Sequence, residues 1–189
     1  MSGSRPIFRA GPVNRRRKGV GCKLSVAGLD RERMDAARQR IRGQVDPSPL
    51  IHCPSLSGLV GRPLHLKLEL LQPSGSFKVR GVFSKLLSMS PAERAAGVVA
   101  VSGGNHGLAV ASAARKLATP AQIFMPDTAP ARSVERIRAD NADLVLCEDV
   151  AQAFAAAESA SAEGRTYVHP FDDLDVVAGQ ATIGLELLD

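Results

Sequence analysis

Residues 73–81 read Pro73-Ser74-Gly75-Ser76-Phe77-Lys78-Val79-Arg80-Gly81. The Pro, Ser and Gly residues of the first half are typical of a tight turn, and we expect Ser74 or Ser76 to cap the helix that follows. Apolar residues then recur at helical spacing, which predicts one buried helix face; they are Val79, Val82, Phe83, Leu86 and Leu87. Lys78 falls in the first turn of this helix, just beside the apolar stripe.

The position of Lys78 has an electrostatic consequence. The positive end of the helix dipole opposes a cation there by about 0.3–1 kcal/mol. Because one pKa unit equals about 1.4 kcal/mol, the dipole alone lowers the pKa of the amine by less than one unit. Burial would have to lower the pKa further for Lys78 to act as a neutral nucleophile. The alternative is an ordinary solvated lysine at a helix start.

A second motif, Ser102-Gly103-Gly104-Asn105-His106-Gly107, follows the apolar run Val98–Val101 and precedes a helix expected over Leu108–Leu117. Two glycines allow a ligand to approach the backbone closely, and the N–H groups of a helix start bind anions. The spacing matches neither G-x-G-x-x-G nor a Walker loop, so the sequence predicts no nucleotide site. The alternative is a tight strand-to-helix turn with a polar cap.

The two motifs together resemble those of the fold-type II pyridoxal-phosphate enzymes, in the threonine/serine dehydratase and serine racemase branch. Val79 stands where the cysteine synthase and threonine synthase branches usually have an acidic residue. His106 stands where the cysteine synthase branch usually has threonine. The resemblance covers about residues 30–189 and implies an α/β fold of the tryptophan synthase beta type.

The resemblance also implies a cofactor, a reaction and a role for each motif residue. The cofactor is pyridoxal 5'-phosphate, and the reaction converts L-threonine or L-serine to a 2-oxo acid and ammonia. Lys78 would bind the cofactor covalently and then act as the general base at the substrate Cα. Phe77 would pack beside the cofactor ring, and Asn105 would contact its phenolic oxygen. The residues implied to hold the substrate carboxylate are Ser102, Gly103, Gly104, Asn105 and His106.

Gly103 favours dehydratase over racemase activity. The racemases that this chain resembles have a serine at that position, and it protonates Cα from the face opposite the lysine. Glycine has no side chain that can donate a proton, whereas dehydration needs only the lysine face. We therefore expect a 2-oxo acid to be the main product.

A third, weaker match lies near the end of the chain. His169–Asp173 and Ala178–Gly184 resemble the segment that returns to the large domain of the family, which usually has glycine where Ala181 stands. We interpret His169 and Asp172 as turn and capping residues. The histidines, including His52, show no metal-ligand spacing, and the three cysteines form no C-x-x-C pair, so no metal site is expected.

Apolar periodicity predicts the elements of an α/β chain. Expected helices cover Asp30–Ile41, with Asp30 as N-cap, Ser55–Leu59, Leu108–Leu117, Pro130–Ala139, capped by Asp127 or Thr128, and Val150–Glu163. Expected strands cover Leu50–Cys53, Leu64–Leu70, Val98–Val101, Gln122–Met125, Leu144–Leu146 and Thr166–Val168. We assign residues 30–98 and 172–189 to part of a large domain and residues 99–171 to a small parallel α/β domain.

The charge of the chain is unevenly distributed. The first 42 residues hold 12 Lys and Arg against 3 Asp and Glu, whereas the rest holds 12 against 16. We expect residues 1–29, with the run Arg15–Lys18, to be a disordered basic extension. Two alternatives are a nucleic-acid-binding tail and a transit peptide. No aromatic residues interleave with the charges, as a nucleic-acid-binding tail would favour, and the glycines and Pro12 oppose the amphipathic helix of a transit peptide.

The remaining expectations concern partners and completeness. We expect a cytoplasmic protein that binds a small hydroxy amino acid but neither nucleic acid nor membrane, and that forms a homo-oligomer, a dimer or a tetramer. The family's glycine-rich phosphate loop and its residue facing the pyridine nitrogen are not found in the 189 residues, which suggests a C-terminally truncated enzyme. The alternative is a non-catalytic remnant or a dimerising module.

From this follows an expectation for residues 1–189 expressed alone. Backbone N–H groups that anchor a phosphate supply much of the binding free energy of such a cofactor. Without them we expect weak binding of pyridoxal phosphate and negligible turnover of hydroxy amino acids. Absorbance titration and a 2-oxo acid assay check this, and a yellow, active preparation would contradict it.

Overall fold

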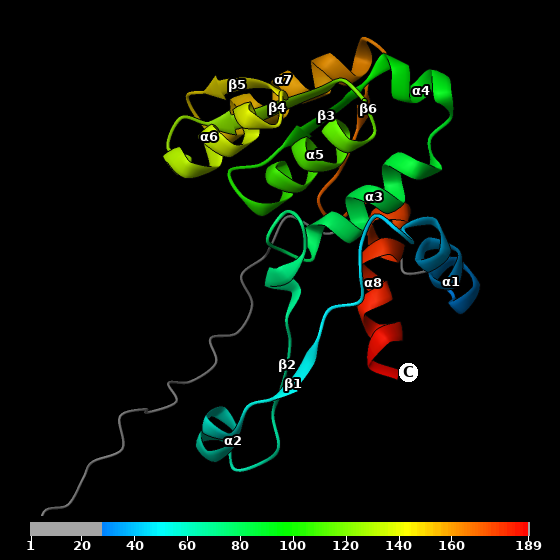
Figure 1. Ribbon diagram of the computed structural model, residues 1–189. Coiled ribbons are helices and arrows are strands. Elements are labelled where there is room, and N and C mark those ends of the chain that lie inside the picture. The colour runs from blue at the N-terminus through cyan, green and yellow to red at the C-terminus, as the bar shows by residue number, and fades with distance from the viewer. Residues whose placement is uncertain (1–27, 189) are drawn as a thin grey trace, which may run out of the picture.

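A computed structural model describes residues 28–188 of the chain, and the larger of its two sheets is parallel and four-stranded. The strands are β3 (Val98–Val101), β4 (Ala121–Pro126), β5 (Asp143–Cys147) and β6 (Thr166–Tyr167), in the order β5-β4-β3-β6 (Figure 1). In register, Val98 pairs with Ala121 on one side and with Thr166 on the other. Helices connect successive strands, as parallel pairing requires.

The sheet is covered on both faces, so β3 is apolar throughout. Val98 and Ala100 point into the core shared with α5 (Asn105–Lys116) and α6 (Ala131–Ala139). Val99 and Val101 point to the opposite face, against the buried alanines of α7 (Val150–Ala162). The continuous apolar run at residues 98–101 is therefore the pattern of a doubly covered parallel strand.

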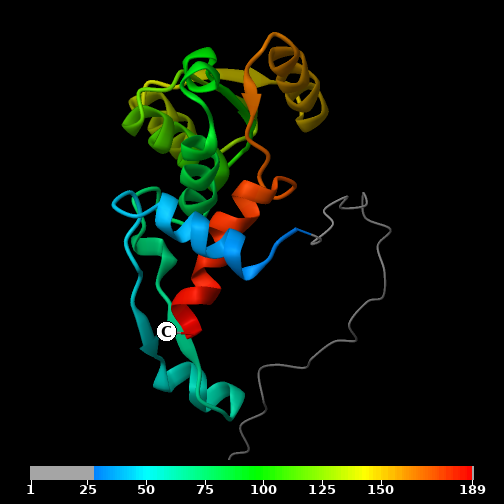
Figure 2. The ribbon, with the colours of Figure 1, turned by 90° about the vertical axis from the view of Figure 1, so that its right-hand side faces the viewer.

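A helical layer lies beside the sheet and contains α1 (Arg31–Arg40), α3 (Lys78–Ser88) and α8 (Leu174–Leu188) (Figures 1 and 2). Asp30 caps α1 by accepting a hydrogen bond from the Arg33 N–H at 2.8 Å, as predicted. The short helix α4 (Pro91–Ala96) joins α3 to the sheet and begins with a capping box formed by Ser90 and Glu93. The sequence interpretation missed α4.

An arm extends from this layer and contains β1 (Leu50–His52), α2 (Pro54–Val60) and β2 (His65–Lys67) (Figures 1 and 2). The two strands pair antiparallel, and the 3-10 turn η1 (Glu69–Leu71) leads from β2 towards α3. His52 lies exposed on the arm. Several large apolar side chains of this region are also exposed: Leu50, Ile51, Leu56, Leu59, Val60, Leu70 and Leu71.

Three local predictions are wrong. The strand expected over Leu64–Leu70 ends at Lys67, because the chain turns into η1. Phe77 occupies the N-cap position of α3, and neither Ser74 nor Ser76 caps it. Likewise, α6 follows Pro130 without a side-chain cap from Asp127 or Thr128.

Other expectations lie outside what the structure tests. The predicted basic extension falls almost wholly on residues 1–27, outside the described residues. The division into residues 30–98 with 172–189 and residues 99–171 stays a prediction. In residues 28–188, every helix is too short or too polar to cross a membrane.

Helices α3 and α8 touch backbone to backbone, because each has a glycine at the crossing. A Cβ atom on Gly179 would lie 2.5 Å from the Arg80 carbonyl oxygen, and one on Gly81 would lie 2.6 Å from the Val176 carbonyl oxygen. Both distances are too short for a real side chain. The two glycines therefore set the spacing between α8 and the first turns of α3.

We predict opposite effects for two glycine substitutions in α8. Gly179→Ala should lower the free energy of unfolding by about 1–3 kcal/mol, because overpacking forces the helices apart. Gly184→Ala is the matched control: its Cβ would meet no atom within 4 Å, so it should raise stability by about 0.5–1 kcal/mol through helix propensity. Urea unfolding measures both. Equal changes in stability for the two variants would contradict the close backbone contact between α3 and α8.

Candidate active site

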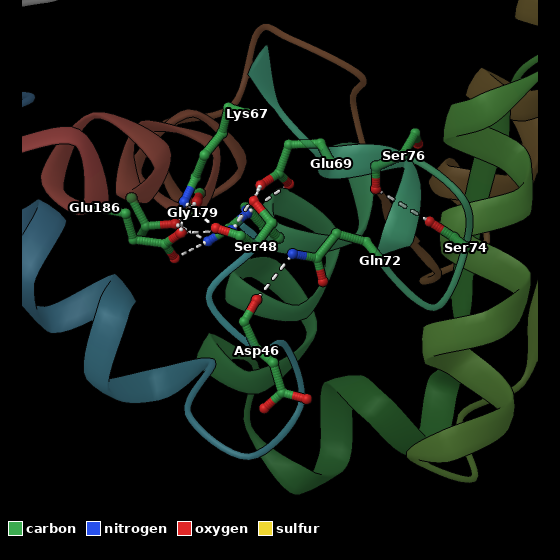
Figure 3. Close-up of polar contacts among 11 residues, drawn as sticks. Asp46, Ser48, Lys67, Glu69, Gln72, Ser74, Ser76, Gly179 and Glu186 are labelled. Atoms are coloured by element: carbon green, nitrogen blue, oxygen red, sulfur yellow. Dashed lines mark hydrogen bonds and ion pairs between the residues drawn. The ribbon is translucent and has the colours of Figure 1, made fainter. Parts of the chain in front are cut away.

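The turn before Lys78 is stabilised by one hydrogen bond within it and by another to a distant part of the chain. Gly75 has a positive φ of 80°, and its N–H donates to the Gln72 carbonyl oxygen at 2.7 Å. The Gln72 side chain in turn donates to the Asp46 carbonyl oxygen at 2.9 Å (Figure 3). This turn brings the chain directly into the first residue of α3, Lys78.

The amine of Lys78 is half-buried and lacks a counter-ion among residues 28–188. Its Nζ donates to the Pro170 carbonyl oxygen at 2.9 Å and lies 5.1 Å from the centre of the Phe77 ring. Burial lowers the pKa of the amine, because a neutral carbonyl compensates little of the lost hydration. Lys67 and Lys85, by contrast, pair with the carboxylates of Glu186 and Asp173.

His106 lies in the first turn of α5 and is only 4% exposed. Its Nε2 is 2.8 Å from the Val168 carbonyl oxygen, which can only accept, so Nε2 carries the proton and Nδ1 is an acceptor. Nδ1 is buried and has no partner within the described part of the chain. Burial, together with the charge of Lys78, lowers the pKa of His106 to about 4, so the imidazole is neutral near pH 7.

The segment Val168–Pro170 is therefore bonded from two helices: by His106 of α5 at one residue and by Lys78 of α3 two residues later. This brings together the two predicted motifs, whose lysine and histidine are near enough for the charge of Lys78 to act on His106. Sequence reasoning missed the role of Pro170, because a backbone carbonyl leaves no residue-type signal.

His169 acts as a turn residue, as predicted. Its Nδ1 accepts from the N–H groups of Phe171 at 3.2 Å and Asp172 at 2.7 Å. The helix α8 is capped by Asp173, whose carboxylate accepts from the Asp175 N–H at 2.8 Å. The capping role expected of Asp172 therefore belongs to its neighbour.

Residues 102–104 form the loop before α5, and this loop is partly exposed to solvent. Ser102 is folded onto the loop, since its hydroxyl accepts from the Gly104 N–H at 3.1 Å. Gly103 and Asn105 are exposed, and a Cβ atom on Gly104 would meet nothing within 4 Å. Among residues 28–188, the first backbone N–H groups of α5 have no acceptor, an arrangement that suits an anion.

These residues fit the covalently attached part of a pyridoxal cofactor. A lysine whose pKa is lowered by burial is a competent nucleophile towards an aldehyde. Phe77, beside it, is 38% exposed, so part of its side chain is open to contact with a bound group. Among residues 28–188, no group of three or more His, Cys, Asp and Glu side chains is placed to hold a metal ion.

Sequence reasoning also missed the surroundings of Arg80. One buried helix face was predicted, yet every residue from Val79 to Ser84 is buried. Arg80 lies inside a cluster of charged and polar side chains: Ser48, Lys67, Glu69, Thr182 and Glu186. The one sequence signal was a charged residue within the otherwise small and apolar run 79–84.

Comparisons with known proteins agree with this geometry. The chain is 40% identical over 166 residues to a phenylserine dehydratase of Ralstonia pickettii, covering 87% of this chain and 48% of that protein. It is 42% identical over 154 residues to an L-threonine ammonia-lyase of Geobacter sulfurreducens, covering 80% of this chain and 38% of that one. The chain thus spans half or less of the length of these relatives.

The maize serine racemase structure superimposes with a TM-score of 0.80 at 30% identity, over 84% of this chain and 49% of that one. The family profile described as "Pyridoxal-phosphate dependent enzyme" matches residues 41–189. The chain therefore belongs to the family of pyridoxal-phosphate-dependent enzymes.

Proposed function

We propose that this chain forms the lysine-bearing part of an ammonia-lyase that dehydrates L-threonine or L-serine to a 2-oxo acid and ammonia. The observation that carries the proposal is the half-buried Lys78 amine, which lacks a counter-ion within residues 28–188 and faces the Pro170 carbonyl. Relatives named threonine ammonia-lyase and phenylserine dehydratase support this reaction class. Pyridoxal phosphate, when bound, supplies an electron sink for the charge left at the substrate Cα.

The residues of this chain then have distinct tasks. Lys78 holds the cofactor and, once released, takes the Cα proton on Nζ; the Pro170 oxygen accepts one N–H and leaves the nitrogen lone pair free. The backbone of Ser102–His106 holds the substrate carboxylate at the start of α5. Phe77 would pack beside the cofactor ring, and Asn105 would contact its phenolic oxygen.

The reaction balances without an added oxidant or reductant. The substrate loses its Cα proton and its β-hydroxyl group, and the hydroxyl leaves as water after taking up a proton. The released enamine then consumes one water molecule to give the 2-oxo acid and ammonia. Assembly into a homo-oligomer stays part of the proposal, and the exposed apolar side chains of the β1–α2–β2 arm are compatible with it.

We predict that Lys78 is the preferred site of reaction with pyridoxal phosphate. After borohydride reduction, peptide mapping by mass spectrometry should find Lys78 modified several-fold more than Lys85 and Lys116 near pH 7. Because burial lowers the pKa of Lys78, the preference should shrink as the pH rises to where ordinary lysines also lose their protons.

Lys78→Ala is the control and should abolish this selective adduct while leaving the other lysines unchanged. Uniform labelling of all lysines in the unaltered chain would refute the assignment of Lys78.

We predict that Gly103 limits racemisation. In a chain extended to the length of its threonine ammonia-lyase relatives, L-serine should give a 2-oxo acid with little D-serine. Gly103→Ser should raise the ratio of D-serine to 2-oxo acid by about tenfold or more, since a placed general acid contributes ~10²–10⁴-fold. A Cβ atom there would lie 3.9 Å from Pro126, so the serine fits.

Chiral chromatography and a 2-oxo acid assay give the ratio. Gly104→Ser, one residue further along the loop, is the matched control and should leave the ratio unchanged. Comparable amounts of D-serine and 2-oxo acid from the unaltered sequence would contradict the assignment.

A further inference from the structure

Arg80 is 1% exposed, and all five N–H groups of its guanidinium are hydrogen-bonded. Nε and Nη2 donate to the two carboxylate oxygens of Glu69, each at 2.8 Å. Nη1 and Nη2 donate to the two oxygens of Glu186 at 2.5 and 3.0 Å, and Nη1 also donates to the Thr182 hydroxyl at 3.2 Å. A planar fork with every donor used allows only one orientation.

The partners of Arg80 come from two segments that are distant in the sequence. Glu69 belongs to η1, just before the lysine turn, and Glu186 belongs to the last turns of α8. Lys67 and Ser48 complete the cluster: the Lys67 amine lies 2.6 Å from Glu186, and the Ser48 hydroxyl donates to Glu69 at 2.6 Å (Figure 3). Two cations and two carboxylates balance each other in the cluster.

Stability alone gives little reason for such a cluster. Burying four charges costs several kcal/mol per ion in hydration, and apolar side chains of similar volume often do as well or better. What an ion cluster adds is direction, because each bond has a preferred angle and an apolar contact does not. Here the bonds determine how the first turn of α3 is rotated about its axis.

The neighbouring glycine contact removes the remaining freedom. A Cβ atom on Gly179 would touch the Arg80 carbonyl oxygen, so the backbone of α3 rests directly on α8 at this residue. The Thr182 hydroxyl, which accepts from Arg80, itself donates to the Gly179 carbonyl oxygen at 2.7 Å. Rotation and approach of the first turn are thus both fixed at Arg80.

Lys78 and Arg80 are two residues apart, which places them about 200° apart around the helix. If the orientation of Arg80 is fixed, the direction in which Lys78 leaves the helix is therefore fixed as well. We propose that Arg80 is a positioning residue, whose bonds to Glu69 and Glu186 aim the Lys78 amine at the Pro170 carbonyl oxygen. This inference rests on the proposed role of Lys78 only for its significance in catalysis.

The test measures the amine itself and needs no cofactor. Competitive acetylation with trace acetic anhydride over a range of pH, read by mass spectrometry, gives the pH midpoint of each lysine in the full chain. Arg80→Lys keeps the charge but cannot make five directional bonds. We expect the Lys78 amine to move into water, so that its midpoint rises and its acetylation near pH 7 falls about three- to tenfold.

Lys67→Met is the matched control, because it removes a charge from the same cluster but lies outside α3. It should lower the melting temperature while leaving the Lys78 midpoint in place. Glu69→Gln is a milder second variant that keeps the shape of the side chain. We expect it to shift the midpoint in the same direction as Arg80→Lys, by a smaller amount, and it decides the matter if Arg80→Lys fails to unfold cooperatively.

Two outcomes would overturn the positioning role. One is an unchanged Lys78 midpoint in Glu69→Gln and in folded Arg80→Lys. The other is a shift in Lys67→Met as large as in Arg80→Lys, which would reduce Arg80 to a structural residue. Selective reaction of Lys78 with pyridoxal phosphate tests the proposed function separately. Failure of the positioning role of Arg80 can therefore be distinguished from failure of the proposed function.

Discussion

The enclosure of the first turn of α3 is the constraint on which the rest of this structure depends. Residues 79–84 are buried on every side, yet two cations, Lys78 and Arg80, lie in this turn. Arg80 is surrounded by carboxylates, whereas Lys78 donates to a backbone carbonyl and has no carboxylate partner among residues 28–188. A cation with full compensation stays charged, whereas one without it loses its proton more readily. The same turn thus contains an anchor and a reactive amine.

Much of the fold could be predicted from the sequence, because burial on two faces leaves a strong apolar pattern. Val98–Val101 reads as a strand for this reason, and α1 and α7 were predicted to within a residue or two at each end. The strand prediction failed where the alternation of apolar and polar residues continues past the end of β2. Leu64–Leu70 alternates cleanly, but β2 ends at Lys67: the Leu68 N–H still donates to the Pro49 carbonyl oxygen at 2.9 Å, and the chain then turns into η1.

The candidate site divides in the same way. Lys78 and Ser102–His106 could be proposed as site residues because they form contiguous motifs at helix starts. The contacts of Lys78 and Arg80 could not be predicted, for two reasons. Pro170 acts through its backbone, and Glu186 lies 106 residues after the arginine it binds, at a distance that no periodicity spans. Lys67 and Glu69 lie in the stretch expected to be a strand, and that expectation gave no sign that they are part of the charged cluster.

The two histidines near the lysine are neutral near pH 7, which simplifies the electrostatics of the site. His106 donates to a carbonyl, and its pKa falls to about 4 through burial. His169 accepts two backbone N–H groups on Nδ1, and burial lowers its pKa as well. With both neutral, the proposed reaction relies on the backbone N–H groups at the start of α5 to orient the substrate carboxylate and on the Lys78 amine to accept the Cα proton.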